Sequence, residues 1–217
     1  MDTKHENVKT FLEYIGSLAD DNKKHPYGIN TDYASMVKAS MLFFNRDEEV
    51  CSWFVPNMKL IDVIQEMHER TKLPIHDMGC GYGLMVALLN YLDIDCYGFD
   101  DESELKRDRM ENLTRLLSPF NITTPDTSKF IKQNITEDQK CGQCILFESW
   151  GRYVEPVDNY IKHGGKYIII VGEGKDGCTW PFSGYVEANY TNIKSSQKII
   201  IPQWNCIHDD VRVTELK

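Results

Sequence analysis

Hydrophobic positions in the first 71 residues recur at helical spacing. Apolar side chains between residues 6 and 18 fall on one face, and a second stripe of this kind covers residues 33–44. A third helix follows Asn57, whose short polar side chain is a favoured N-cap. The pattern predicts an N-terminal helical extension over residues 1–71, packed as a cap on the rest of the chain.

From residue 72 onward, short apolar runs alternate with helical segments, which is typical of an α/β fold built on a parallel sheet. Residues 72–217 are therefore expected to form one Rossmann-like, doubly wound domain with seven strands. The predicted strands lie around Ile75 and at residues 94–99, 130–131, 144–149, 166–171, 198–201 and 211–216. The predicted helices between them lie at residues 84–92, 104–117 and 153–163.

A glycine-rich turn joins the first of these strands to a helix that is apolar nearly all round. The turn reads Asp77-Met78-Gly79-Cys80-Gly81-Tyr82-Gly83. The next strand ends in Asp100 and Asp101, and Asp100 lies 23 positions after Asp77. A spacing of about 20 residues is usual between a glycine turn and a carboxylate that holds a ribose. The stretch therefore indicates a nucleoside-binding βαβ unit.

The residues beside the turn select the kind of nucleotide. A dinucleotide fingerprint requires a third glycine at position 84, which is Leu84. Asp77 would also repel the two charges of a pyrophosphate, whereas it suits a ligand that carries an ammonium and a sulfonium. A turn that serves only strand-to-helix packing is the alternative interpretation.

Asp77 to Gly83 resembles motif I of the class I S-adenosylmethionine-dependent methyltransferases. The resemblance implies a seven-stranded sheet with its last strand antiparallel, and S-adenosylmethionine as the cofactor. It also implies that the turn lies under the methionine part of the cofactor and that Asp100 holds the ribose hydroxyls. Further expected cofactor contacts are Asp101, as the neighbouring alternative to Asp100, Glu148 at the end of the fourth predicted strand, and Trp53 in the segment before the turn. The residues it assigns to the turn are Asp77, Gly79, Cys80, Gly81 and Gly83.

The chain over residues 50–217 also resembles a little-characterised methyltransferase-like group. The shared segments are an aromatic-x-x-Pro segment, a tryptophan after the fourth strand, a Gly-Glu-Gly turn and a Pro-Gln-Trp tail. In this sequence they are Trp53 to Pro56, Trp150, Gly172 to Cys178 and Pro202 to Asp209. This group supports the fold and the cofactor, and it names no methyl acceptor. Trp53 could equally serve as a hydrophobic staple at the start of its helix.

Three residues are candidates for accepting the proton of the methyl acceptor: Glu148, Tyr153 and His208. His208 is also interpretable as an ordinary histidine of the tail. Enzymes that methylate amino groups of adenine or glutamine carry Asp/Asn-Pro-Pro-Tyr/Phe after the fourth strand. Ser149 to Tyr153 departs from this motif, which disfavours those substrates.

Composition narrows the remaining classes. The net charge of −9 and a pI near 5.2 disfavour non-specific nucleic-acid binding. No membrane segment or secretory signal is recognisable, and seven scattered cysteines favour reduced thiols in the cytoplasm or nucleus. The Cys141-x-x-Cys144 pair has no second pair near it, so no metal site is predicted.

The sequence therefore predicts an S-adenosylmethionine-dependent methyltransferase acting on an unidentified acceptor, with a small molecule or a protein favoured. Two other classes stay open. One is a cofactor-binding partner or scaffold subunit without catalysis, and the other is a dehydrogenase-like protein that binds a different nucleotide. The four tryptophans lie beside predicted strand ends or before the glycine turn, where they are expected either to line an acceptor site or to fill gaps under loops.

Overall fold

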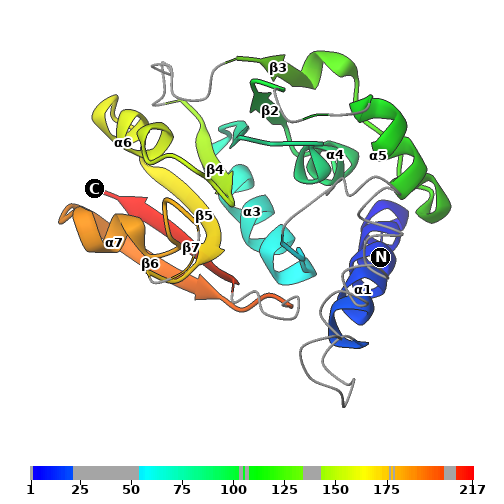
Figure 1. The fold of residues 1–217 in the computed structure, drawn as a ribbon, viewed down its shortest axis with the longest axis horizontal. Helices are drawn as coiled ribbons and strands as arrows, with labels where there is room; N and C mark the ends of the chain where they lie inside the picture. The colour runs from blue at the N-terminus through cyan, green and yellow to red at the C-terminus, as the bar shows by residue number, and fades with distance from the viewer. Residues whose placement is uncertain are drawn as a thin grey trace.

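The structure is a computed structural model, and its ribbon is drawn in Figure 1. It describes residues 2–21, 54–102, 105, 108–133, 143–175, 177, 179–202 and 209–217. The helix predicted at residues 33–44 lies outside the described residues, and so do Trp53, Trp204 and His208.

One seven-stranded sheet organises the described chain. Its spatial order is β3-β2-β1-β4-β5-β7-β6, with β7 antiparallel to both of its neighbours and parallel pairing from β3 through β5. This order confirms the predicted Rossmann-like sheet with its last strand antiparallel. The strands are β1 (Ile75–Met78), β2 (Cys96–Asp100), β3 (Phe130–Lys132), β4 (Ile145–Ser149), β5 (Tyr167–Glu173), β6 (Ile193–Ile199) and β7 (Asp209–Leu216).

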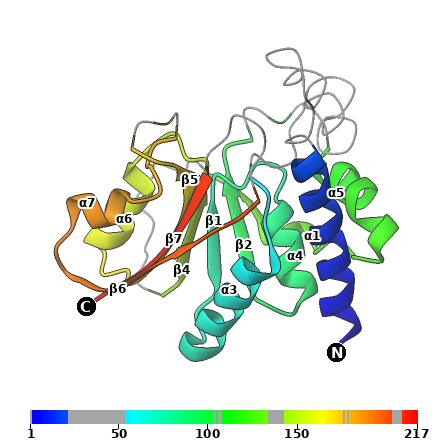
Figure 2. The same cartoon turned by 90° about the horizontal axis from the view of Figure 1, so that it is seen from below.

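Helices cover both faces of the sheet, as the two views in Figures 1 and 2 show. Side chains of α1 (Thr3–Asp21), α3 (Met58–Thr71), α4 (Leu84–Tyr91) and α5 (Arg109–Leu117) share one buried cluster with the sheet. Side chains of α6 (Glu155–Lys162) and α7 (Tyr185–Asn189) share a second cluster on the other face. The strand order reverses between β1 and β4, and ligands of open α/β sheets bind outside the strand ends at this switch point.

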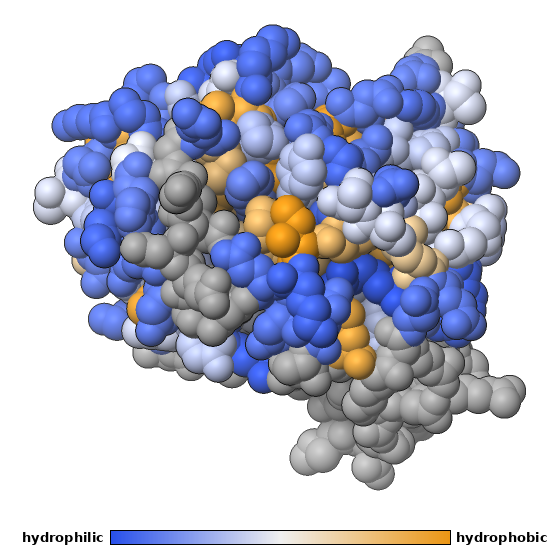
Figure 3. All heavy atoms as spheres, turned by 90° about the horizontal axis from the view of Figure 1, so that it is seen from above, coloured by the Kyte–Doolittle hydropathy of each residue, from blue (hydrophilic) through white to orange (hydrophobic). Residues whose placement is uncertain are grey.

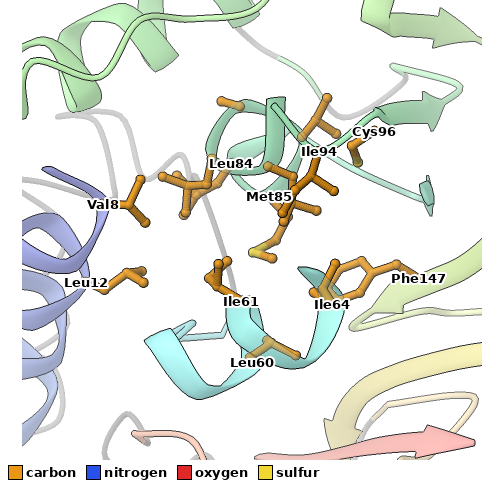
Figure 4. Close-up of a cluster of buried hydrophobic side chains, with 14 of the residues drawn as sticks. Val8, Leu12, Leu60, Ile61, Ile64, Leu84, Met85, Ile94, Cys96 and Phe147 are labelled. Carbon is orange, nitrogen blue, oxygen red and sulfur yellow. The ribbon is translucent and has the colours of Figure 1, made fainter. Parts of the chain in front are cut away.

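The N-terminal helices belong to the same core as the sheet. Asn57 caps α3, because its side chain accepts a hydrogen bond from the Leu60 amide at 3.0 Å. Figure 4 shows Val8 and Leu12 of α1 facing Ile61 of α3 and Leu84 of α4. Burial of this kind contributes about 1.5–3 kcal/mol for each large apolar side chain.

Several element boundaries differ from the prediction. The helix predicted from residue 104 begins at Arg109, because Asp108 caps it by accepting from the Glu111 amide at 2.9 Å. The strand predicted at 198–201 covers Ile193–Ile199 instead, and its middle residues are exposed and polar. Its pairing with β7 forms this strand, and an edge strand with two polar faces leaves no hydrophobic signal in the sequence. Helix α7 was not predicted.

None of the helices in the described part of the chain combines the length and apolar character needed to cross a membrane. The face drawn in Figure 3 is mostly hydrophilic, with a small hydrophobic area near its centre.

Candidate cofactor site

The glycine turn between β1 and α4 lies at the switch point of the sheet, and its glycines expose the main chain there. Gly81 has φ +52° and Gly83 has φ +79°, a left-handed region that L side chains rarely adopt. A Cβ atom at Gly83 would lie 2.3 Å from the Phe130 ring, so the helix can start there only without a side chain. A Cβ atom at Gly81 would meet no atom within 4 Å. Gly81 therefore borders open space that a ligand can fill.

Asp100, at the end of β2, is held by two backbone amides. Its Oδ2 accepts from the Gly81 amide at 2.8 Å, and its Oδ1 accepts from the Glu102 amide at 2.7 Å. Each carboxylate oxygen has a second lone pair, so the carboxylate can still accept from two ligand hydroxyls. Asp101, the alternative from the sequence, is exposed, whereas Asp100 is partly buried beside the turn.

Asp77 is the buried carboxyl group of the turn. Its side chain is 2 % exposed, and its Oδ1 makes no hydrogen bond within the described chain. Burial raises the pKa of Asp77 to about 8, and the nearby Asp100 adds to this, while Arg109 opposes it. A buried carboxyl oxygen without a hydrogen bond in the described chain is the kind of atom that a ligand cation can satisfy.

Cys80 occupies a different position from its neighbours in the turn. A Cβ atom on Gly98 of β2 would lie 2.6 Å from the Cys80 Sγ, so this thiol packs on β2. Burial raises the pKa of Cys80 well above its usual range. We therefore place Cys80 in the packing of the turn.

Arg109 also contacts the turn, and sequence reasoning missed it. It is the first residue of α5 and is 8 % exposed. Its Nε donates to the Gly81 carbonyl oxygen at 3.0 Å, and its guanidinium lies 4.6 Å from the centroid of the Phe130 ring. In the sequence, Arg109 is one of several charged residues after the second predicted strand, and no pattern selects it from among them.

The two described candidates for proton removal, Glu148 and Tyr153, differ in their exposure to solvent. Glu148 is 1 % exposed, and its Oε2 makes no hydrogen bond within the described chain. Burial raises the pKa of Glu148 well above its usual range, and Asp77 and Asp158 add to this effect. A Cβ atom on Gly151 would lie 2.1 Å from the Glu148 Oε1, so the following loop covers this carboxyl group. Tyr153, by contrast, is 48 % exposed.

The tryptophans divide into two environments. Trp150 is partly buried against the main core, and its Nε1 donates to the two carboxylate oxygens of Asp209 at 3.0 and 3.1 Å. Trp180 is 49 % exposed and contacts the rings of Phe182 and Tyr185. The indole contact of Trp150 with Asp209 agrees with the expectation that a tryptophan fills a gap under a loop, and an acceptor site lined by tryptophans stays a prediction.

Within the described residues, no group of three or more histidine, cysteine, aspartate or glutamate side chains could hold a metal ion. Cys144 of the Cys-x-x-Cys pair is buried, and its carbonyl oxygen accepts from the Tyr160 hydroxyl at 2.7 Å. Cys141 lies outside the described residues.

Comparisons with known proteins give structural neighbours of low similarity. No family model matches the sequence, and no curated protein matches it. A tRNA methyltransferase, TrmI, from Aquifex aeolicus aligns with a TM-score of 0.49 and 10% identity over 73% of this chain and 68% of that one. Magnesium protoporphyrin IX methyltransferase from Synechocystis, with bound S-adenosylmethionine, aligns with a TM-score of 0.48 and 11% identity. The alignment covers 100% of this chain and 98% of that one.

A ribosomal RNA methylase from Streptococcus thermophilus aligns with a TM-score of 0.46 and 12% identity over 72% of this chain and 96% of that one. Scores and identities at this level carry no argument about the activity of this chain. The fold assignment rests on the strand order and pairing described above.

Proposed function

We propose that this protein is an S-adenosylmethionine-dependent methyltransferase acting on a small molecule or a protein. One observation carries the proposal. At the switch point of the sheet, Gly81 borders open space and its amide donates to Asp100, while the nearby buried carboxyl group of Asp77 has an oxygen without a hydrogen bond in the described part of the chain. This set of groups suits a ligand with ribose hydroxyls and a cation but no phosphate.

The residues present fit that cofactor. Asp100 would accept hydrogen bonds from the ribose hydroxyls, and Asp77 would face the positively charged methionine portion. Gly81 would let the backbone approach the cofactor closely, because a side chain there would occupy the open space. When bound, the cofactor supplies an activated methyl group, and the chain contributes position and a dry environment.

The dinucleotide alternative fits less well. Leu84 stands where a third glycine would let helix and strand approach, and its side chain is buried in the core at 2 % exposure. Asp77 lies beside the turn, where its negative form would repel a pyrophosphate. Both features favour a ligand without phosphate.

Proton removal from the acceptor would fall to Glu148 among the described candidates. Burial raises its pKa well above the usual range, which makes the carboxylate a stronger base, and its Oε2 has no partner within the described chain. Carboxyl groups at the ends of β1, β2, β4 and β5 make this edge acidic, which disfavours a phosphate-rich acceptor.

A second candidate function is a cofactor-binding partner subunit without catalysis. The observation in its favour is the closure of Glu148 beneath Gly151, which leaves this carboxyl group 1 % exposed. The two functions share the cofactor site and differ only in the use of the edge beyond β4.

Calorimetry with S-adenosylmethionine, S-adenosylhomocysteine and NAD tests the proposal on the full chain. We expect the first two to bind and NAD to give no heat. Incubation with S-adenosylmethionine labelled in its methyl group, in a cell extract, should then label an acceptor. Binding of NAD alone would refute the proposal, and cofactor binding without any labelled acceptor would favour the partner subunit.

A further inference from the structure

Four residues around the glycine turn form a closed ring of hydrogen bonds. The amides of Gly81 and Glu102 donate to the two oxygens of Asp100, at 2.8 and 2.7 Å. Arg109 donates to the same two residues from the other side, with Nε on the Gly81 carbonyl at 3.0 Å and Nη1 on the Glu102 Oε1 at 3.1 Å. Arg109 does not bond to Asp100 in this ring. It holds both residues that do.

The ring has stiff supports. The Arg109 guanidinium lies over Phe130, whose own ring packs against Gly83 and so fixes the start of α4. Planar guanidinium groups stack well on aromatic faces and bind two acceptors in a fixed geometry, which lysine cannot do. Arg109 is 8% exposed, and hydrogen bonds in a setting of this kind are stronger than bonds made in water.

Glu102 needs this support, because its backbone is in an unfavourable conformation. Its φ is +61°, a left-handed value that costs a residue with a side chain about 1 kcal/mol or more. The Lys132 Nζ lies 3.4 Å from the Glu102 Oε2, but the Lys132 side chain is 71% exposed. The buried partner of Glu102 in the ring is therefore Arg109.

We propose that Arg109 is a positioning residue for the ribose carboxylate Asp100. Arg109 holds Gly81 and Glu102 in place, and the amides of these two residues orient the carboxylate of Asp100. The orientation of Asp100 in turn gives the site its preference for a ligand with ribose hydroxyls. This inference rests on the proposed cofactor site, but it concerns binding and is independent of catalysis. It assigns Arg109 no contact with the ligand.

The test compares two ligands across a set of variants. The ligands are S-adenosylhomocysteine and its analogue without the two ribose hydroxyls, and calorimetry gives the affinity ratio between them. Variants are Arg109→Gln, Arg109→Lys, Asp100→Asn and the double variant Arg109→Gln/Asp100→Asn. Arg115→Gln is the matched control, because Arg115 lies exposed on the same helix. Thermal unfolding without ligand monitors the fold of each variant.

We expect the wild-type ratio to be roughly 30-fold or more, the size expected for hydrogen bonds to a charged group. Asp100→Asn and Arg109→Gln should each reduce it to a few-fold, Arg109→Lys to an intermediate value, and Arg115→Gln should leave it unchanged. The affinity ratio of the double variant should equal that of Asp100→Asn alone, because both changes remove the same interaction with the ribose hydroxyls.

A general loss of packing would weaken both ligands equally and leave the ratio unchanged, and that result would overturn the inference. If Arg109→Gln fails to fold, the affinity ratio of the two ligands in Arg109→Lys tests the role of Arg109 instead. A wild-type protein that binds neither ligand would refute the proposed function itself. A wild-type protein that binds with a high ratio, unaffected in every Arg109 variant, would refute the role of Arg109 alone.

Discussion

Both halves of the sheet edge carry carboxyl groups, but these groups have different hydrogen-bond partners in the two halves. In the β1–β2 half, Asp100 is oriented by backbone amides, and Asp77 keeps an oxygen without a partner. In the β4–β7 half, Asp209 at the start of β7 accepts from the indole of Trp150, and Asp158 of the neighbouring helix α6 accepts from the hydroxyls of two tyrosines, Tyr185 and Tyr190.

The difference shows which acidic groups are available to a ligand. A carboxylate that accepts from amides keeps lone pairs on its open side, whereas one that is covered by aromatic side chains has its open side filled. In the described residues, the β1–β2 half thus keeps acceptor atoms without a partner, as the proposed cofactor site requires, whereas the carboxylates of Asp158 and Asp209 in the β4–β7 half accept from aromatic side chains. Glu148 is the exception in the β4–β7 half, because its Oε2 has no partner within the described chain.

The pH dependence of stability should separate the two halves with the largest effect. Burial raises the pKa of Asp77 to about 8 and that of Asp209 to about 7. A carboxyl with a raised folded pKa favours the folded state fully below its unfolded pKa, and this advantage is lost as pH rises through the folded pKa. Between pH 6 and pH 8, we therefore expect the free energy of unfolding of the ligand-free protein to fall by about 2 kcal/mol through Asp77 and by about 1.5 kcal/mol through Asp209.

Chemical denaturation at several pH values measures this fall, with Asp77→Asn and Asp209→Asn as paired variants. Each variant should flatten part of the curve. Saturating S-adenosylhomocysteine should alter the Asp77 contribution and leave that of Asp209 in place. A curve that does not change in either variant would show that these carboxyls do not set the pH response.

Trp150→Phe tests the β4–β7 half by stability. The change removes one hydrogen-bond donor from a buried carboxyl group, Asp209, and leaves a smaller ring in the core. Loss of such a partner should lower the free energy of unfolding by about 1.5 kcal/mol. Trp180→Phe is the control, because Trp180 is half exposed, and it should change stability by less than about 0.5 kcal/mol.

Urea denaturation at pH 8, where Asp209 is ionised, measures both variants. Equal stability of the two would mean that the indole contact with Asp209 contributes nothing. A strong loss of cofactor affinity in Trp150→Phe would instead indicate that Trp150 contributes to ligand binding.

Gly81→Ala tests the β1–β2 half against a matched position. Gly81 and Gly164 both have positive φ, +52° and +84°, and an added Cβ meets no atom within 4 Å at either position. Alanine at each position should therefore cost similar stability, about 1 kcal/mol. Only Gly81→Ala should weaken S-adenosylhomocysteine, by roughly tenfold or about 1.4 kcal/mol, because its methyl group enters the ligand space.

Thermal unfolding and calorimetry on the same two proteins separate the strain from the loss of binding. Unchanged affinity in Gly81→Ala, with the expected loss of stability, would place the ligand away from the turn. An equal loss of affinity in Gly164→Ala would indicate a general weakening of the fold.

Much of the fold was predictable because it follows from local hydrophobic pattern. The apolar residues of β4, Ile145 to Phe147, and most of the apolar helix at Leu84–Tyr91 are buried as the sequence indicates. The N-cap at Asn57 was predictable for the same reason, since capping depends on neighbouring residues only. Strand β6 was placed wrongly, because its exposed polar residues carry no period and its pairing partner lies later in the chain.

The sequence alone determined the glycine turn, the acidic strand ends and their spacing, since each depends on residue type at fixed separation along the chain. Tertiary structure decided which of these groups stay available. It directed the Trp150 indole onto Asp209, closed Gly151 over Glu148, and brought Arg109 to the Gly81 carbonyl across 28 positions of sequence. Such contacts depend on how α5 and the strands pack in space, and a hydrogen bond between distant residues leaves no periodic trace in a single sequence.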